Sequence, residues 1–153
     1  MPTLEDVYAK FGFASEAAQL LETELGTRLF LAGAIEAGLF ESSDSGKATE
    51  LLMFVNRQTL GQLLKSLGRT NDSIDQLEDV LKEALRQRNR LSHSFYRQHN
   101  WRRNSEEGRA VMMDDLETIH DSILVAYKAV MRLSGIDLDA VTLERLPTGH
   151  LPI

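Results

Sequence analysis

The stretch Ser105–Gly135, SEEGRAVMMDDLETIHDSILVAYKAVMRLSG, carries the clearest structural pattern in the chain. Ser105 is a good N-cap residue, and the two glutamates after it suit the positive end of a helix dipole. Apolar side chains then recur at alternating intervals of four and three, as in the seam of a helical bundle. They are Met112, Leu116, Ile119, Ile123, Ala126, Val130 and Leu133. We therefore predict one long amphipathic helix that Gly135 ends.

The remainder of the chain is also predicted to be helical. The only prolines are Pro2, Pro147 and Pro152, so residues 3–146 lack the residue that is barred from helix interiors. Apolar periodicity predicts further helices, which cover residues 4–11, about 15–39, about 48–67, 73 to about 95, and 137–145. We predict a single all-α domain over residues 1–153, a four-helix up-and-down bundle with short extra terminal helices. Its core covers about 15–134, and the short C-terminal helix and tail cover 137–153.

Composition excludes several classes of protein. The chain has no Cys, which rules out disulfides, thiolate catalysis and thiolate metal sites in it. The longest apolar run, Leu29 to Phe40, is broken by Glu36 and is too short to span a bilayer. Acidic residues follow the N-terminus at once, where a secretory leader would be basic and then apolar. We expect a cytoplasmic protein with no cofactor and no membrane partner.

One basic and aromatic stretch, Arg86 to Arg103, stands out from an acidic chain of net charge −6. It holds six of the 17 Lys and Arg residues and none of the 23 Asp and Glu residues. Arginine offers planar donors for phosphate, and aromatic rings offer stacking faces for bases. The nucleic-acid-binding residues predicted from this pattern are Arg86, Arg90, Tyr96, Arg97, His99, Trp101, Arg102 and Arg103. For Trp101, an anchor in an interface or core is the alternative.

Within this stretch, residues 88–93 read R-N-x-L-x-H. An arginine, followed directly by asparagine and five positions later by histidine, resembles the signature of the HEPN superfamily. The resemblance is tight over 88–93 and loose over about 15–134. It implies a small all-α bundle that is commonly dimeric, with the motif just before the last long helix. Many such proteins are metal-independent ribonucleases acting as toxins or in antiviral defence, and others are inactive dimerisation or RNA-binding modules.

The residue types in the motif suit this chemistry. A histidine ordinarily titrates near neutrality, so this residue type at position 93 can act as the acid or base when a ribose 2′-OH attacks the adjacent phosphate. Arg88 can stabilise the charge that grows on the phosphate oxygens, and Asn89 can orient either group. We therefore predict Arg88, Asn89 and His93 as the catalytic residues, with a symmetric dimer pooling two copies across a cleft.

Helical geometry also supports a structural interpretation of the same residues. Arg88 falls within the apolar stripe of its helix, where it needs a carboxylate partner or a cleft. The carboxylates considered are Glu22, Glu50 and Glu117. His93 points about 140° away from Arg88 on a straight helix, so a bend or a second subunit is needed to join them. His93 can equally be an ordinary surface histidine.

Two functions follow. The first is a HEPN-like metal-independent ribonuclease; the second is a non-catalytic helical dimer that binds RNA or a protein through the 86–103 face. Expected partners are a second copy of the chain, RNA, and a cognate antitoxin or other regulatory protein. Glu117 and His120 match the E-x-x-H of di-iron bundles, but that site needs a second copy, which the chain lacks. No metal site is predicted.

Overall fold

The computed structural model describes residues 1–69 and 72–140, and every regular element in these two ranges is helical. The predicted all-α class is therefore confirmed for this part of the chain. The elements in order are α1 (Leu4–Glu36), α2 (Ser45–Asn56), α3 (Leu60–Gly68), α4 (Asp72–Asp75), α5 (Glu78–His93), α6 (Phe95–Gln98), the 3-10 turn η1 (Arg102–Asn104) and α7 (Glu106–Arg132). Among the helices described, none combines the length and the apolar character that crossing a bilayer requires.

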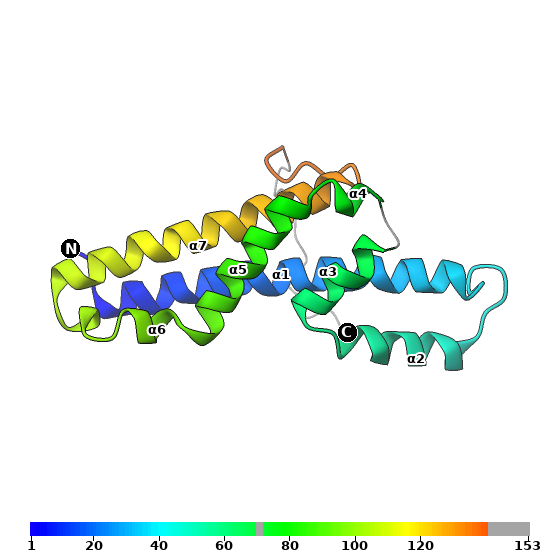
Figure 1. The fold of residues 1–153 in the computed structure, drawn as a ribbon, viewed down its shortest axis with the longest axis horizontal. Coiled ribbons are helices and arrows are strands. Elements are labelled where there is room, and N and C mark those ends of the chain that lie inside the picture. Colours follow the sequence, from blue (N-terminus) through cyan, green and yellow to red (C-terminus); the bar gives the residue numbers. More distant parts are fainter. Residues whose placement is uncertain (70–71, 141–153) are drawn as a thin grey trace.

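Helix α1 runs along the long axis of the molecule (Figure 1). Helix α7 lies along α1 from its N-terminal end as far as Arg28 in the most extensive helix–helix contact, and α5 packs on both. Helices α2 and α3 also contact α1, with α2 beside its C-terminal half. The largest fully buried side chains of the shared core are Phe95, Leu21, Leu25, Leu60, Leu67, Met112, Leu116, Ile119, Ile123, Val7 and Val130.

Helix α1 is continuous where the sequence predicted two helices, over 4–11 and about 15–39. It begins with a capping box, in which the Thr3 side chain accepts from the Asp6 amide and the Asp6 carboxylate accepts from the Thr3 amide. Ser15 does not cap a second helix, because its hydroxyl donates to the Phe11 carbonyl at 2.8 Å. The split into two helices was wrong.

The helix predicted over 48–67 divides into α2 and α3. Thr59 and Gln62 form a second capping box, which starts α3 after a break of three residues, 57–59. The prediction of one continuous helix was therefore wrong, because the T-x-x-Q capping box starts a new helix inside an apolar pattern that reads as continuous.

The last helix is confirmed, with Ser105 as its N-cap and its apolar seam buried through Val130. Leu133 is the exception: it is 38% exposed because the helix ends at Arg132. The short helix predicted over 137–145 lies mostly outside the described residues.

A two-helix arm, residues 29–56, extends beyond α5 and α7 at one end of the molecule (Figure 1). It comprises the C-terminal part of α1, the connecting loop and α2. The two helices pack closely here, since a Cβ on Gly33 would lie 2.7 Å from Leu51 Cδ1 and the Leu51 side chain would have to shift. Val55 is likewise packed close to Gly26.

Candidate nucleic-acid interface

The basic turn, residues 93–104, connects α5 to α7 at the end of the molecule opposite the arm (Figure 1). Phe95 anchors it, since its ring is 1% exposed and lies 5.8 Å, between ring centroids, from Phe11 of α1. The turn is thereby held on the core, and the polar residues around Phe95 are placed on its outer side.

Two residues of α7 fix the second half of the basic turn. Gly108 lets the η1 backbone approach, because a Cβ there would lie 2.7 Å from the carbonyl carbon of Arg102 and closer still to its oxygen. Arg109 donates from Nη1 to the Arg103 carbonyl at 3.1 Å and from Nε to the Pro2 carbonyl at 2.7 Å. The backbone that carries Arg102 and Arg103 is therefore tied to both α7 and the N-terminus.

A buried polar network supports the basic turn from below. His99 is only 3% exposed, with Nε2 2.6 Å from Asp115 Oδ2 and Nδ1 3.1 Å from Arg102 Nη1. Because a guanidinium can only donate, Nδ1 is the acceptor and the Nε2 hydrogen goes to the carboxylate. Arg90 also donates to Asp115, and to Gln98 Oε1 at 2.7 Å. The imidazole of His99, predicted to contact RNA, thus positions Arg102 from inside the protein.

Asp115 is the member of this network that sequence reasoning missed. Burial raises the pKa of its carboxyl, but the hydrogen bonds from Arg90 and His99 outweigh burial and hold that pKa below its usual value. The available signal was the acidic pair Asp114-Asp115 on the helix that follows the basic stretch.

Three of the six arginines are neutralised by carboxylates. Arg86 makes two hydrogen bonds to Glu83, and these are the main cause that lowers the pKa of that glutamate to about 2. Arg88 donates from Nε to Glu22 Oε1 at 2.8 Å, so one of the three carboxylates considered from the sequence is its partner. Arg90 is the third, paired with Asp115. These three arginines carry little free positive charge to the surface.

Two of the three remaining arginines, Arg97 and Arg103, line an open hollow of about 430 Å³. Arg97 bonds only to the His93 carbonyl and the Ser94 hydroxyl, at 3.4 and 3.3 Å, and the guanidinium of Arg103 has no bond within the described residues. Trp101 is 78% exposed, which excludes a core anchor in this chain. The hollow is lined by Tyr96, Arg97, His99, Asn100, Trp101, Arg103, Asn104 and Met112, none of them acidic.

The structure does not join the predicted catalytic residues into one cluster. Arg88 is half-buried against Glu22, and its Nη1 donates to Asn89 Oδ1 at 3.1 Å. His93 is exposed at the end of α5, and within the described residues its imidazole has no hydrogen bond or ion pair. Among the described residues, the basic group nearest to it in the chain without a carboxylate partner is Arg97, four residues further on.

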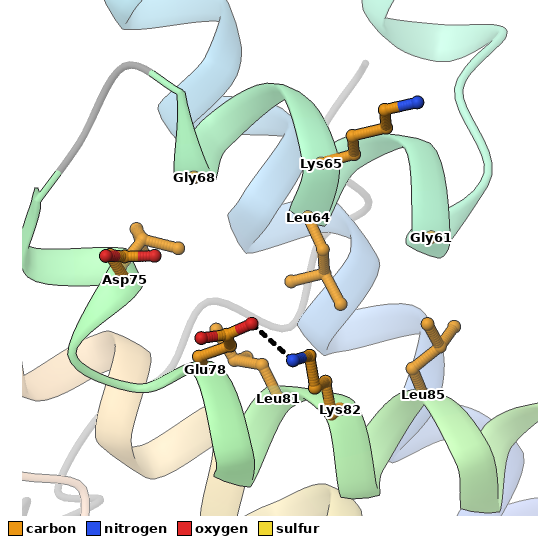
Figure 2. A pocket seen from close by; sticks show the side chains of 10 residues that line it. Gly61, Leu64, Lys65, Gly68, Asp75, Glu78, Leu81, Lys82 and Leu85 are labelled. Carbon is orange, nitrogen blue, oxygen red and sulfur yellow. Dashed lines mark ion pairs between the residues drawn. The ribbon is translucent and has the colours of Figure 1, made fainter.

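The other polar clusters and hollows are weaker candidates for a functional site. His120 lies beside Lys10, with Nδ1 3.5 Å from Nζ; burial first and then this ammonium lower its pKa. Within 1–69 and 72–140 no group of His, Asp and Glu could hold a metal ion. A hollow of about 320 Å³ between α3 and α5 is largely apolar, and Figure 2 shows leucines at its centre with the Lys82–Glu78 ion pair beside them. It presents no set of groups suited to catalysis.

Comparisons with protein-family models, with curated proteins and with solved structures find no match for this chain. The HEPN resemblance of residues 88–93 therefore stays a prediction.

Proposed function

We propose that the chain is a helical RNA-binding module whose contact surface is the basic turn. The observation that carries this proposal is the gathering of Arg97, Arg103 and the exposed Trp101 around a hollow without acidic side chains. Arginines track phosphates, while an indole face stacks on a base regardless of its identity. The HEPN resemblance, with its expected bundle and homodimer, supports the same class of ligand.

Single-stranded RNA fits this surface better than a duplex. A base can stack on an indole only when it is free of its own neighbours, as in loops and single strands. The charged part of the site is also small, because carboxylates neutralise Arg86, Arg88 and Arg90. A short segment of a few nucleotides is the ligand that such a patch accommodates inside an acidic protein.

Binding of a labelled single-stranded RNA, followed by fluorescence anisotropy in excess chelator, tests the proposal. Trp101→Ala should weaken binding about tenfold or more, since stacking on one aromatic side chain contributes roughly 1–3 kcal/mol. The double variant Arg97→Ala/Arg103→Ala should weaken it further. Arg57→Ala/Arg86→Ala removes the same charge elsewhere on the surface and is the matched control.

Equal losses in the two double variants would contradict the proposal, because they would show that only net charge matters. A wild-type chain that binds neither RNA nor the matching single-stranded DNA would also contradict it. In that case the basic turn would be left as a surface for a protein partner.

A second candidate, a metal-independent ribonuclease, is favoured by the exposed and unpartnered His93. In this mechanism the ribose 2′-oxygen attacks the phosphorus and His93 accepts its proton; the bond from phosphorus to the 5′-oxygen breaks, and that oxygen takes up a proton from water. The products are a 2′,3′-cyclic phosphate and a 5′-hydroxyl end. In the single chain Arg97 is available to bind the phosphate, because it forms no ion pair with a carboxylate of the described residues. Arg88 could bind the phosphate only if its ion pair with Glu22 opened.

Cleavage of RNA in excess chelator separates this activity from binding alone. His93→Ala should abolish cleavage and leave RNA affinity within about twofold, and His120→Ala should cleave as the wild type does. A substrate with deoxyribose at the scissile position should be inert. Equal cleavage by wild type and His93→Ala would exclude the assignment and leave the binding module standing.

A further inference from the structure

A second open hollow adjoins the one beside Trp101, since His99 lines both. Its volume is about 400 Å³, within the range of roughly 300–1,000 Å³ that is usual for small-molecule sites. The consecutive residues Trp101 and Arg102 line one hollow each. A nucleotide that follows or precedes one stacked on Trp101 can therefore place its base in the second hollow.

The charges around this second hollow are mixed, and we call it the mixed hollow. Two guanidiniums, of Arg90 and Arg102, and two carboxylates, of Asp114 and Asp115, line it, so the formal charges cancel. The hollow beside Trp101 differs, because its lining holds no acidic residue. Carboxylates repel a phosphate, so the mixed hollow suits a neutral ligand that offers both donors and acceptors.

One carboxylate and one guanidinium of the mixed hollow are available to a ligand. Asp115 already accepts from Arg90 and His99. Asp114 is exposed, and its carboxylate forms no hydrogen bond or ion pair within residues 1–69 and 72–140. Arg102 donates from Nη1 to His99 Nδ1 at 3.1 Å, and its Nε and Nη2 groups have no partner in the same two ranges. The buried imidazole thus orients a guanidinium whose other donors remain open.

An apolar contact completes the mixed hollow. Val111, which is 45% exposed, also lines it and lies three residues before Asp114 on the same face of α7. A flat heterocycle can rest on this side chain while its edges meet the polar groups.

We propose that the mixed hollow binds a guanine base of the RNA strand held by the basic turn, an inference that rests on the proposed RNA binding. A carboxylate can accept two neighbouring hydrogen bonds, and guanine alone among the four bases carries two adjacent donors, N1–H and the 2-amino group. Asp114 accepts from these two donors. Arg102 donates to O6 and N7, the acceptors that arginine ordinarily contacts on guanine. Unstacked bases of single strands expose both edges to such contacts.

Anisotropy with three labelled strands tests the proposal: a short oligoadenylate, the same strand with one central guanine, and the same strand with inosine there. The wild-type chain should prefer the guanine strand about tenfold, as is typical of one bidentate base contact. Inosine lacks the 2-amino group, so the inosine strand should lose most of this preference.

Asp114→Asn gives the sharpest readout, because the two explanations predict opposite signs. Removing a negative charge near the basic turn should by itself tighten the binding of every strand. The proposal predicts instead that the guanine strand binds about tenfold more weakly while the oligoadenylate does not. Asp121→Asn removes the same charge from an exposed position further along α7 and should keep the preference for guanine.

Arg102→Lys is the second variant, since it keeps the positive charge and removes the planar pair of donors. It should reduce the preference for guanine without reducing the affinity for the oligoadenylate. Equal wild-type affinity for the guanine and adenine strands would overturn the guanine site and leave the RNA-binding module standing. Tighter binding of both strands by Asp114→Asn would also overturn it. A chain that binds none of the three strands would overturn both proposals.

Discussion

Gly108→Ala is expected to damage both the fold and the site, because the added methyl group has no room. Its Cβ would lie 2.7 Å from both the Cα and the carbonyl carbon of Arg102. These are backbone atoms, which cannot rotate away as the end of a side chain can. The η1 segment has to move by about 1 Å or more to restore van der Waals contact at about 3.5–4.0 Å.

The loss of stability in Gly108→Ala follows from the contacts that the shift of η1 disrupts. Overpacking of a well-filled site costs about 1–3 kcal/mol. The movement also strains the N-cap bond from the Gly108 amide to Ser105 Oγ, worth about 1 kcal/mol, and the bond from Arg109 to the Arg103 carbonyl. We expect the free energy of unfolding to fall by about 2–4 kcal/mol, and the affinity for RNA to fall with it because Arg103 is displaced.

Urea unfolding followed by circular dichroism, with anisotropy on the folded variant, measures both effects. Gly12→Ala is the control, because Gly12 is an exposed helical position with nothing within 4 Å of an added Cβ. It should raise the stability by about 0.5–1 kcal/mol through helix propensity alone. A Gly108→Ala chain as stable as the wild type, with unchanged RNA affinity, would refute the close approach of η1 to α7.

Two further predictions concern the ion pairs of Asp115 and of Arg88. Asp115→Asn should lower the free energy of unfolding by about 2 kcal/mol at neutral pH, because Arg90 and His99 lose a charged acceptor. The folded state lowers the pKa of Asp115 below its ordinary value of 3.8, so its contribution to stability is present above pH 3.8 and is lost as the pH falls below that value. The urea midpoints at pH 7 and pH 3 should therefore differ less for the variant than for the wild type. A double-mutant cycle on Arg88→Ala and Glu22→Ala should give a coupling energy of about 0.5–1 kcal/mol, and RNA affinity unchanged in Arg88→Ala would show that this arginine is structural.

The helices were predictable wherever a local rule decided them. The seam of α7 and its Ser105 cap follow from spacing and residue type alone, and the structure confirms both. The helix ends inside apolar runs were not predicted, because the Thr59–Gln62 capping box competes with a pattern that reads as continuous. Leu133 has the spacing of the buried seam but is 38% exposed, because α7 ends one residue earlier, at Arg132.

The site was predictable as a stretch but not as a set of contacts. Composition identified residues 86–103 as basic and aromatic, and Glu22 was among the carboxylates considered for Arg88. The sequence could not separate neutralised from free arginines, because that depends on carboxylates up to 66 positions away. Nor could it indicate that His99 is buried, because the helix breaks at Ser94, so the period of α5 does not extend to His99.

The salt dependence of RNA binding tests the central claim most directly, because the slope of log affinity against log salt counts the phosphates that the protein neutralises. For a single strand each such contact contributes about 0.7 to the slope. We predict that Arg97→Ala/Arg103→Ala reduces the magnitude of the slope by about 1.4, while Arg57→Ala/Arg86→Ala leaves it as in the wild type. Identical slopes for all three proteins would show that the basic turn does not contact the phosphates.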